Sequence, residues 1–264
     1  MAFPPERARL GLSCLSLTAD PEMHVIPHDT HLQIGSLLFE GLDQIDLTGP
    51  FEVLSRIPNA TYRIYGKAAG PVRDLKGLRL TPDAALADAP QLDVLHVPGG
   101  FGQEALMESA EVLAWIRQQA AGARSIFSVC TGALLFGAAG LLKGRRATTH
   151  WASHHLLPFF GATPVNERVV VDGTWIFAAG VTAGIDGALR LAAELRGDDV
   201  ARAIQLHMAY APEPPFDSGT PETAPAAILQ QARQSVAAIM AQREATARRV
   251  ATSLGIQVPA GGGE

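Results

Sequence analysis

Short apolar runs separated by helical segments constrain the fold of this chain more than any other feature. The runs at 32–39, 92–97 and 125–129 are too apolar to be half-exposed strands, and 61–67 forms a further strand. Strands that are buried on both faces and alternate with helices are typical of a parallel sheet covered by helices. The sequence therefore predicts an α/β fold, in which a mostly parallel sheet carries helices on both faces.

Turn and capping signals place the other elements. Thr48 is the expected N-cap of a helix that has Pro50 in its first turn and runs to about residue 56. Asx-Gly and Lys-Gly pairs at turn positions indicate hairpins. Hairpins are expected at 72–81 and 168–178, and further helices at 109–121, from the Cys130 turn to about 142, at 182–196, at 198–207 and at 226–254.

Composition limits the classes of function. With 264 residues, 47% of them hydrophobic, the chain is long enough for one well-buried core and too short for two ordinary domains. Its formal net charge of −5 gives no basic surface for nucleic acid or for an anionic membrane, so neither is expected as a partner. No apolar run reaches the roughly eighteen residues that a bilayer span requires.

Two cysteines, Cys14 and Cys130, are too few for a disulfide framework, so a reducing cytoplasm is the expected location. The mildly apolar stretch 10–18 keeps a signal peptide open as an alternative, although it is short and has no clear cleavage site. A loose N-terminal extension is the simpler interpretation of that stretch.

Changes in composition divide the chain into three segments. We expect an N-terminal extension at 1–30 that is disordered, an α/β domain at 31–210, and a loop with a C-terminal helix at 211–264. A lone alanine-rich helix needs a surface to pack on. That surface belongs either to the domain itself or to a partner subunit.

Cys130 gives the strongest chemical signal. The strand at 125–129 runs directly into it, and the small residues from Thr131 to Ala133 allow a helix to begin at once. This turn puts the sulfur at the carboxyl edge of the sheet, where open α/β folds bind ligands. The N-terminus of the next helix is expected to favour the thiolate and lower the thiol pKa. We interpret Cys130 as a nucleophile, with a small buried core residue as the alternative.

Two other segments are expected at the same edge. Pro98-Gly99-Gly100 follows the strand at 92–97, and glycines there let backbone N–H groups face developing negative charge. Asp46 follows the first strand, and a carboxyl beside a thiol shares a proton with it, so the two groups titrate as a unit. A partly buried Asp46 holds that proton more readily and can donate it. The alternative for Asp46 is a helix-capping role.

The run from His150 to His155 contains an i, i+4 pair, His150 and His154. Such a pair is able to bind zinc, but neither an intervening glutamate nor an obvious third ligand accompanies it. The sequence therefore predicts no metal site. His150 is a candidate for the wall of a pocket, and His154 with His155 is expected on a solvated helix face.

Together these segments resemble the ThiJ/PfpI family of the class I glutamine-amidotransferase-like superfamily over residues 32 to about 210. The resemblance rests on DLTGP at 46–50, VPGG at 97–100, SVCTG at 128–132, ATTHW at 147–151 and TAGID at 182–186, and continues into YAPEPPF and TPETAP in the tail. Within the family the chain looks most similar to isonitrile hydratases. The resemblance implies a flavodoxin-like three-layer sandwich, a homodimer, a small-molecule substrate, and neither a metal nor an organic cofactor.

The resemblance also implies roles for individual residues. Cys130 becomes the nucleophile and Asp46 its acidic partner, while Thr131 stands where amidotransferase-like and peptidase-like relatives usually have histidine. The implied substrate-binding or oxyanion positions are Gly99, Gly100, Thr131 and Val181. The chain departs from the family pattern just before Thr182, where the hydratases are glycine-rich and this chain has Ala178-Ala179-Gly180-Val181.

The implied activity adds water to an isonitrile and gives an N-substituted formamide through a cysteine thioimidate. One alternative is another cysteine enzyme of the family, a glyoxalase or deglycase, although these use a glutamate where this chain has Asp46. A second is a non-catalytic domain that senses a ligand, or one that senses oxidation of Cys130. Some transcription regulators carry this domain ahead of a helix-turn-helix module, whereas one long helix is expected after residue 210.

Overall fold

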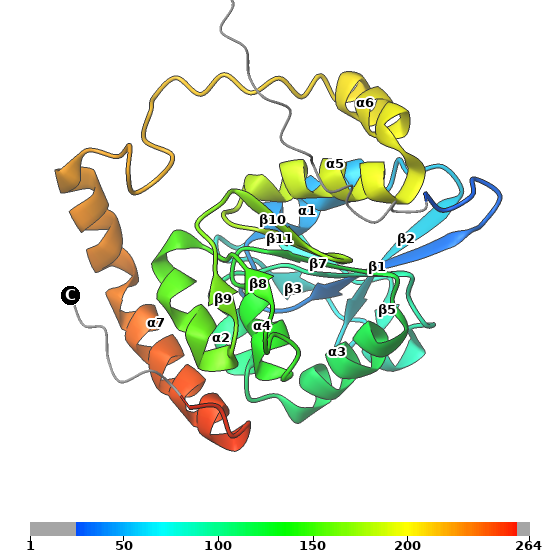
Figure 1. Cartoon of the computed structure of the whole chain (residues 1–264). Coiled ribbons are helices and arrows are strands. Elements are labelled where there is room, and N and C mark those ends of the chain that lie inside the picture. Colours follow the sequence, from blue (N-terminus) through cyan, green and yellow to red (C-terminus); the bar gives the residue numbers. More distant parts are fainter. Residues whose placement is uncertain (1–24, 258–264) are drawn as a thin grey trace, which may run out of the picture.

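The structure, a computed structural model, describes residues 25–257 and confirms the predicted α/β fold. A seven-stranded sheet in the order β10-β11-β7-β6-β1-β2-β5 runs through the centre of the molecule (Figure 1). Each neighbouring pair is parallel except β10 with β11. The strands are β1 (Leu32–Leu38), β2 (Ala60–Gly66), β5 (Ala84–Ala85), β6 (Val94–Val97), β7 (Ser125–Val129), β10 (Val169–Asp172) and β11 (Trp175–Ala178).

Two short ribbons lie outside this sheet. β3 (Val72–Arg73) pairs antiparallel with β4 (Arg79–Leu80), which confirms the hairpin expected at 72–81. β8 (Arg146–Ala147) pairs parallel with β9 (Thr163–Pro164). The sequence does not predict β5, β8 or β9, because strands of two residues have no periodicity to detect.

Helices cover both faces of the sheet. α1 and α5 lie on one face and α3 and α4 on the other (Figure 1), each over its own apolar core. α6 packs on α5, and α7 packs on η2. The helices are α1 (Gln44–Leu54), α2 (Gln103–Leu106), α3 (Ala110–Gly122), α4 (Gly132–Ala138), α5 (Ala183–Arg196), α6 (Asp198–His207) and α7 (Ala226–Ser253), with 3-10 turns at η1 (Leu86–Asp88) and η2 (Trp151–Phe160). Within 25–257 no helix has the length and apolar character of a membrane span.

The prediction for the start of α1 is wrong by several residues. Asp43 is the N-cap, and its side chain accepts a hydrogen bond from the Ile45 N–H at 3.2 Å. Thr48 lies inside the helix, where its Oγ1 donates to Gln44 Oε1 at 2.8 Å. Pro50 also lies inside, so the carbonyl four residues earlier, that of Asp46, has no helical N–H to accept.

The helix after Cys130 is shorter than expected. α4 ends at Ala138 and not near residue 142. A Schellman arrangement closes it, since the Leu141 N–H donates to the Phe136 carbonyl at 3.0 Å and the Gly140 N–H to the Gly137 carbonyl at 2.9 Å. The apolar run continues past this point because Ala139 and Leu142 are also buried, which hides the end of the helix from a hydrophobicity pattern.

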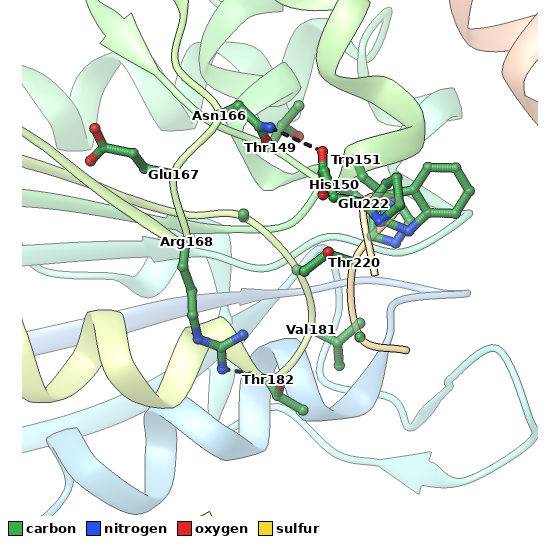
Figure 2. Close-up of a pocket in the computed structure, with 14 residues that line it drawn as sticks. Thr149, His150, Trp151, Asn166, Glu167, Arg168, Val181, Thr182, Thr220 and Glu222 are labelled. Atoms are coloured by element: carbon green, nitrogen blue, oxygen red, sulfur yellow. Dashed lines mark hydrogen bonds between the residues drawn. The ribbon is translucent and has the colours of Figure 1, made fainter. Parts of the chain in front are cut away.

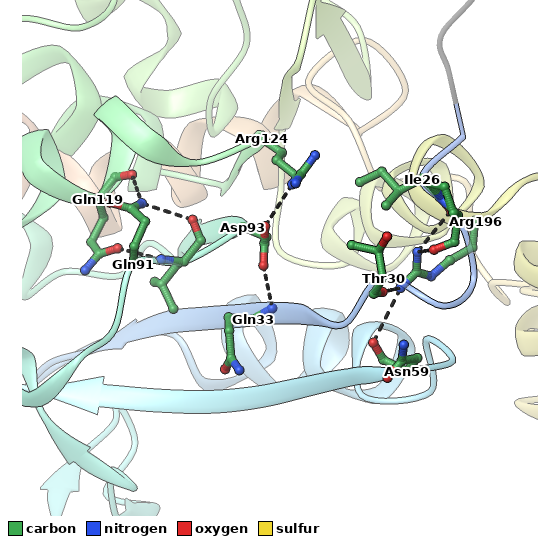
Figure 3. A network of polar contacts seen from close by, with 11 residues as sticks. Ile26, Thr30, Gln33, Asn59, Gln91, Asp93, Gln119, Arg124 and Arg196 are labelled. Atoms are coloured by element: carbon green, nitrogen blue, oxygen red, sulfur yellow. Dashed lines mark hydrogen bonds and ion pairs between the residues drawn. The ribbon is translucent and has the colours of Figure 1, made fainter.

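Hydrogen bonds tie the amino ends of the strands together (Figure 3). Arg196 is only 2% exposed at the end of α5. It donates at 2.6 to 3.4 Å to the backbone carbonyls of Ile26, Pro27, Thr30, Pro58 and Asn59. Asp93, just before β6, accepts from the Gln33 N–H at 2.8 Å and from Arg124 Nε at 2.9 Å. These hydrogen bonds hold the amino end of the sheet together. The candidate site lies at the opposite, carboxyl end.

Candidate active site

Cys130 occupies the turn between β7 and α4 with a φ of 55°, in the left-handed region. A non-glycine residue in that conformation costs on the order of 1–3 kcal/mol and is held there by its surroundings. Here the Cys130 N–H donates to the Ala178 carbonyl at 2.9 Å, and Thr149 Oγ1 donates to the Cys130 carbonyl at 2.7 Å. The sharp turn that the sequence predicts is present and is fixed on both sides of the cysteine.

Two glycines let the loops after β6 and β7 touch. A Cβ at Gly132, the first residue of α4, would overlap the carbonyl oxygen of Val97. A Cβ at Gly99 would lie 2.5 Å from the Thr131 nitrogen and 2.9 Å from Asp46 Oδ2. Backbone therefore packs directly against backbone at these points. The two loops meet at one edge, as neighbouring parallel strands predict.

Asp46 lies in the first turn of α1 and is completely buried. Its Oδ2 accepts from the Gly99 N–H at 2.9 Å, while its Oδ1 has no hydrogen-bond partner among residues 25–257. Because Asp43 caps the helix, the carboxyl of Asp46 is not the capping group. It is available to the Cys130 side chain, with which it interacts.

Burial controls the titration of this pair. It raises the pKa of Asp46 to about 8, with a further increase from Asp43, while the Gly99 N–H and the Cys130 side chain act to lower it. Burial also raises the pKa of the Cys130 thiol well above its usual range, as does Asp46, against the opposing effects of the Thr131 N–H and the Arg243 charge. The two groups therefore keep their protons at neutral pH.

The thiol pKa thus moves opposite to the direction expected from the helix N-terminus. The reason is that Cys130 is only 6% exposed, so the desolvation of a thiolate outweighs the stabilisation that the short helix α4 provides. Asp46, by contrast, is held protonated, as expected for a carboxyl buried beside a thiol.

The amides of Gly99 and Gly100 are engaged within the protein. Gly99 donates to Asp46, as described, and the Gly100 N–H donates to Thr131 Oγ1 at 3.1 Å. In this arrangement the two glycines position the side chains beside the sulfur instead of opening toward a ligand. The N–H group that faces the sulfur belongs to Thr131.

A pocket of about 390 Å³ lies between the start of η2 and the β11–α5 turn (Figure 2). Its wall is formed by the start of η2, the segment before β10, the β11–α5 turn and the loop before α7. The lining residues are Thr149, His150, Trp151, Asn166, Glu167, Arg168, Ala179, Gly180, Val181, Thr182, Gly219, Thr220, Pro221 and Glu222. Thr149 belongs to this wall and also contacts the Cys130 carbonyl, which connects the pocket to the turn.

The structure divides the site residues that the sequence suggests into two groups. Asp46, Gly99, Gly100 and Thr131 gather around Cys130. Val181 instead lines the pocket, to which neither Cys130 nor Asp46 contributes a wall.

The histidines after β8 are placed separately. His150 lines the pocket, as expected, and burial together with the Arg243 charge lowers its pKa to about 4, so its ring is neutral. The His154 ring contacts the Val165 carbonyl at 3.1 Å and is partly buried, so it is not fully solvated as expected. Within residues 25–257 no three His, Cys, Asp or Glu side chains converge as metal ligands would.

Sequence reasoning missed Arg243, which α7 places beneath the loop after β6. Its Nη2 donates to the Gly100 carbonyl at 2.6 Å, and the residue is 3% exposed. A signal was available, because helical spacing puts Arg243 on the same face as Ala247 and Val250, both buried. An arginine within a buried stripe needs an explanation.

His96, in β6, was also missed. Its Nδ1 lies 2.5 Å from Ser36 Oγ, and burial lowers its pKa to about 3, against the effect of the Asp46 backbone. A neutral histidine thus lies behind Asp46. The signal was a histidine inside an otherwise apolar strand.

The fold and the cysteine turn define a class, and comparison with known proteins agrees with it. The DJ-1/PfpI family model matches residues 33–194, and the chain belongs to that family. It is 51% identical to an isonitrile hydratase of Pseudomonas putida over 226 residues, which cover 86% of this chain and 99% of that enzyme. The family and the sandwich fold that the resemblance implies are thus confirmed.

Two other relatives place the chain within the family. The crystal structure of a ThiJ/PfpI family protein from Pseudomonas syringae has a TM-score of 0.81 at 39% identity, covering 89% of this chain and 98% of that one. The HTH-type transcriptional regulator CdhR of Pseudomonas aeruginosa is 31% identical over 62% of this chain, but the match covers 49% of the regulator. The similarity to the hydratase therefore extends over more of both chains than the similarity to the regulator.

Proposed function

We propose that this protein is an isonitrile hydratase, in which Cys130 is the nucleophile and Asp46 the proton donor. The observation that carries the proposal is the burial of one thiol and one carboxyl together at the carboxyl edge of the sheet, where burial raises the pKa of both groups. The identity to the P. putida isonitrile hydratase along nearly its whole length supports the same activity.

The first step forms a bond between the Cys130 sulfur and the terminal carbon of the isonitrile. That carbon accepts the sulfur and must then gain a proton at the same atom. Asp46 gives its proton to the carbon and takes the thiol proton, so one proton moves in total from sulfur to carbon. The product is a thioimidate, and the carboxyl is protonated again.

In the second step water adds to the thioimidate carbon. Asp46 orients the water, one water proton reaches the nitrogen, and the hydroxyl stays on the carbon. Cleavage of the carbon–sulfur bond then releases the N-substituted formamide, and the hydroxyl proton returns to the Cys130–Asp46 pair. The sum is one isonitrile and one water giving one formamide, with the enzyme regenerated.

The pocket at the β11–α5 turn is the proposed site for the substituent of the isonitrile. The reacting group itself is a two-atom rod, which fits a buried sulfur, while the substituent needs the larger space near Val181. Exchange of Val181 for tryptophan should raise KM for a bulky aryl isonitrile several-fold and leave KM for a methyl isonitrile almost unchanged. An equal effect on both substrates would argue against this placement.

The direct test supplies p-nitrophenyl isocyanide and methylglyoxal in parallel to the purified protein and to Cys130→Ala. The proposal expects the wild type to form the N-aryl formamide and the variant to form none. Consumption of methylglyoxal in place of the isonitrile would instead support a glyoxalase or deglycase. Consumption of neither substrate would favour a sensing role.

The proposal extends to the setting of the enzyme. A homodimer is expected from the family resemblance, and a cytoplasmic location and the lack of a nucleic-acid partner are expected from the cysteine usage and the net charge of −5. Light scattering, cell fractionation and a DNA-shift assay at low salt test these expectations one by one.

A further inference from the structure

Arg243 is a buried cation that has no ordinary ion-pair partner. It is 3% exposed, and no carboxylate oxygen lies within 4.0 Å of its nitrogens among residues 25–257. Moving a charge from water into a protein costs several kcal/mol unless other groups compensate it. The charge of Arg243 therefore costs stability where it lies, and a neutral side chain would avoid that cost. We look for a role of the charge in the groups around it.

The contacts of Arg243 aim it at the nucleophile loops. Nη2 donates to the Gly100 carbonyl at 2.6 Å and Nη1 to Ser153 Oγ at 3.4 Å. The guanidinium carbon lies 5.7 Å from the ring centre of Phe101. Nε is buried with no hydrogen-bond partner within 25–257. All these partners are neutral, so none of them balances the charge.

The hydrogen bond from Arg243 to Gly100 connects it to Cys130 through Thr131. The Gly100 N–H donates to Thr131 Oγ1, and Thr131 follows Cys130 directly. α7 thus clamps the loop after β6 against the residue whose N–H faces the sulfur, across 143 residues of sequence between Gly100 and Arg243.

Within residues 25–257, Glu104 is the one carboxyl group that acts on the pKa of Arg243. Burial lowers its pKa, while Cys130 and then Glu104, on α2, act to raise it. Glu104 is itself held by Thr246, whose Oγ1 donates to Glu104 Oε1 at 2.6 Å. The other titratable group affected by Arg243 is His150, on the η2 side, while Asp46 and Asp43 face Cys130 from α1 and its cap.

We propose that Arg243 is a positioning residue for Cys130, which holds the Gly100 loop against Thr131 and supplies the positive charge that balances the thiolate formed during the reaction. The proposal builds on the function proposed above, because it assigns the electrostatic control of the same sulfur. It makes the C-terminal helix part of the active-site support and not only a packing element.

The test measures the titration of Cys130 in the full-length protein without any isonitrile. Alkylation by iodoacetamide is followed across pH by mass spectrometry of the peptide that contains Cys130, which separates it from Cys14. Arg243→Met removes the charge and keeps much of the volume. The Cys130 pKa should rise by about one unit, so alkylation at neutral pH should slow about tenfold. Arg243→Lys should restore most of the rate.

Arg233→Met is the matched control, because this arginine is exposed on the same helix and its replacement changes the net charge equally. It should leave the Cys130 profile unchanged. A folded Arg243→Met protein with the wild-type alkylation profile would overturn the proposal, as would an equal shift in the Arg233 control.

A second variant should change the alkylation rate of Cys130 in the opposite direction. It keeps the proposal testable if Arg243→Met does not fold. Glu104→Gln keeps the hydrogen bond from Thr246 but removes the competing negative charge. Alkylation of Cys130 at neutral pH should then become about threefold faster, a factor that corresponds to half a pKa unit. Unchanged or slower alkylation would contradict the proposal. Since no substrate is used, failure of the isonitrile assay does not affect this result.

Discussion

The two ends of the central sheet differ in how their polar groups are hydrogen-bonded. At the amino end, Arg196 donates to five backbone carbonyls, and Asp93 links β1 to Arg124, the residue before β7. At the carboxyl end, buried polar atoms such as Asp46 Oδ1, His96 Nε2 and Arg243 Nε have no hydrogen-bond partner within residues 25–257, and Cys130 has a positive φ. Both ends are polar, but the unpartnered buried atoms named above lie at the carboxyl end.

This difference in hydrogen bonding indicates which end of the sheet contributes to stability and which to the reaction. Buried polar groups are normally paired, so a cluster of unpaired ones marks a place that substrate or a transition state completes. The strain at Cys130 points to the same end. Residues at the amino end should therefore affect folding and not turnover, and residues at the carboxyl end should do the reverse.

The largest effect is expected for Asp46→Asn. The amide keeps the shape of the side chain but has no acidic proton to give to the isonitrile carbon. General acid–base groups contribute about 10²- to 10⁴-fold, so kcat/KM should fall roughly a thousandfold. Steady-state kinetics with p-nitrophenyl isocyanide measure this loss, and circular dichroism establishes that the variant is folded. Activity within fivefold of the wild type would break the assignment of Asp46.

Arg196→Met should give the largest loss of stability. It leaves the carbonyls at the amino end without their donor, which should lower the free energy of unfolding by about 3 kcal/mol. Turnover per folded molecule should stay within twofold, because no part of this network touches Cys130. Urea denaturation gives the first quantity, and Arg190→Met, an exposed site on the same helix, is the control. A stable variant with impaired turnover would reverse the comparison.

The pH dependence of stability should also distinguish the two ends. The folded state keeps the Asp46 proton up to about pH 8, whereas the unfolded chain releases it near pH 3.8. Folding therefore becomes less favourable as pH rises between these values, by roughly 1.4 kcal/mol per pH unit. Asp46→Asn removes this contribution, so its stability relative to the wild type should increase from pH 5 to 7. Parallel stability profiles would show that Asp46 is ionised in the folded protein.

The smallest effect is expected at Arg124, whose ion pair with Asp93 is half exposed on the arginine side. Arg124→Ala should change the free energy of unfolding by less than about 1 kcal/mol, because solvent screens such pairs. A loss as large as that of Arg196→Met would mean that the surface pair, and not the buried arginine, holds the amino end together.

The sequence predicts most of the sheet because its signals are local. The runs that become β1 and β7 are bounded within one residue, since strands buried on both faces must be apolar throughout. The start of α1 is harder, because Asp43 and Thr48 both offer capping oxygens and only the packed structure decides between them. Elements of two residues have no pattern at all.

The site is predictable where it follows strand ends and unpredictable where it depends on the tail. Cys130, Asp46 and Gly99 come together because three parallel strands end at one edge. Arg243 reaches them from a helix far along the chain, and local sequence does not reveal its target. The raised thiol pKa is also a tertiary effect, because it depends on how completely the packed chain excludes water from the sulfur.

The central claim is that the Cys130 sulfur bonds to the isonitrile carbon. Rapid acid quenching of a single turnover of p-nitrophenyl isocyanide by the wild-type protein, followed by peptide mass spectrometry, tests it directly. The account predicts that the peptide with Cys130 gains the mass of one isonitrile molecule, and that this adduct disappears as formamide forms. Formamide production with no adduct on Cys130 at any quench time would contradict it.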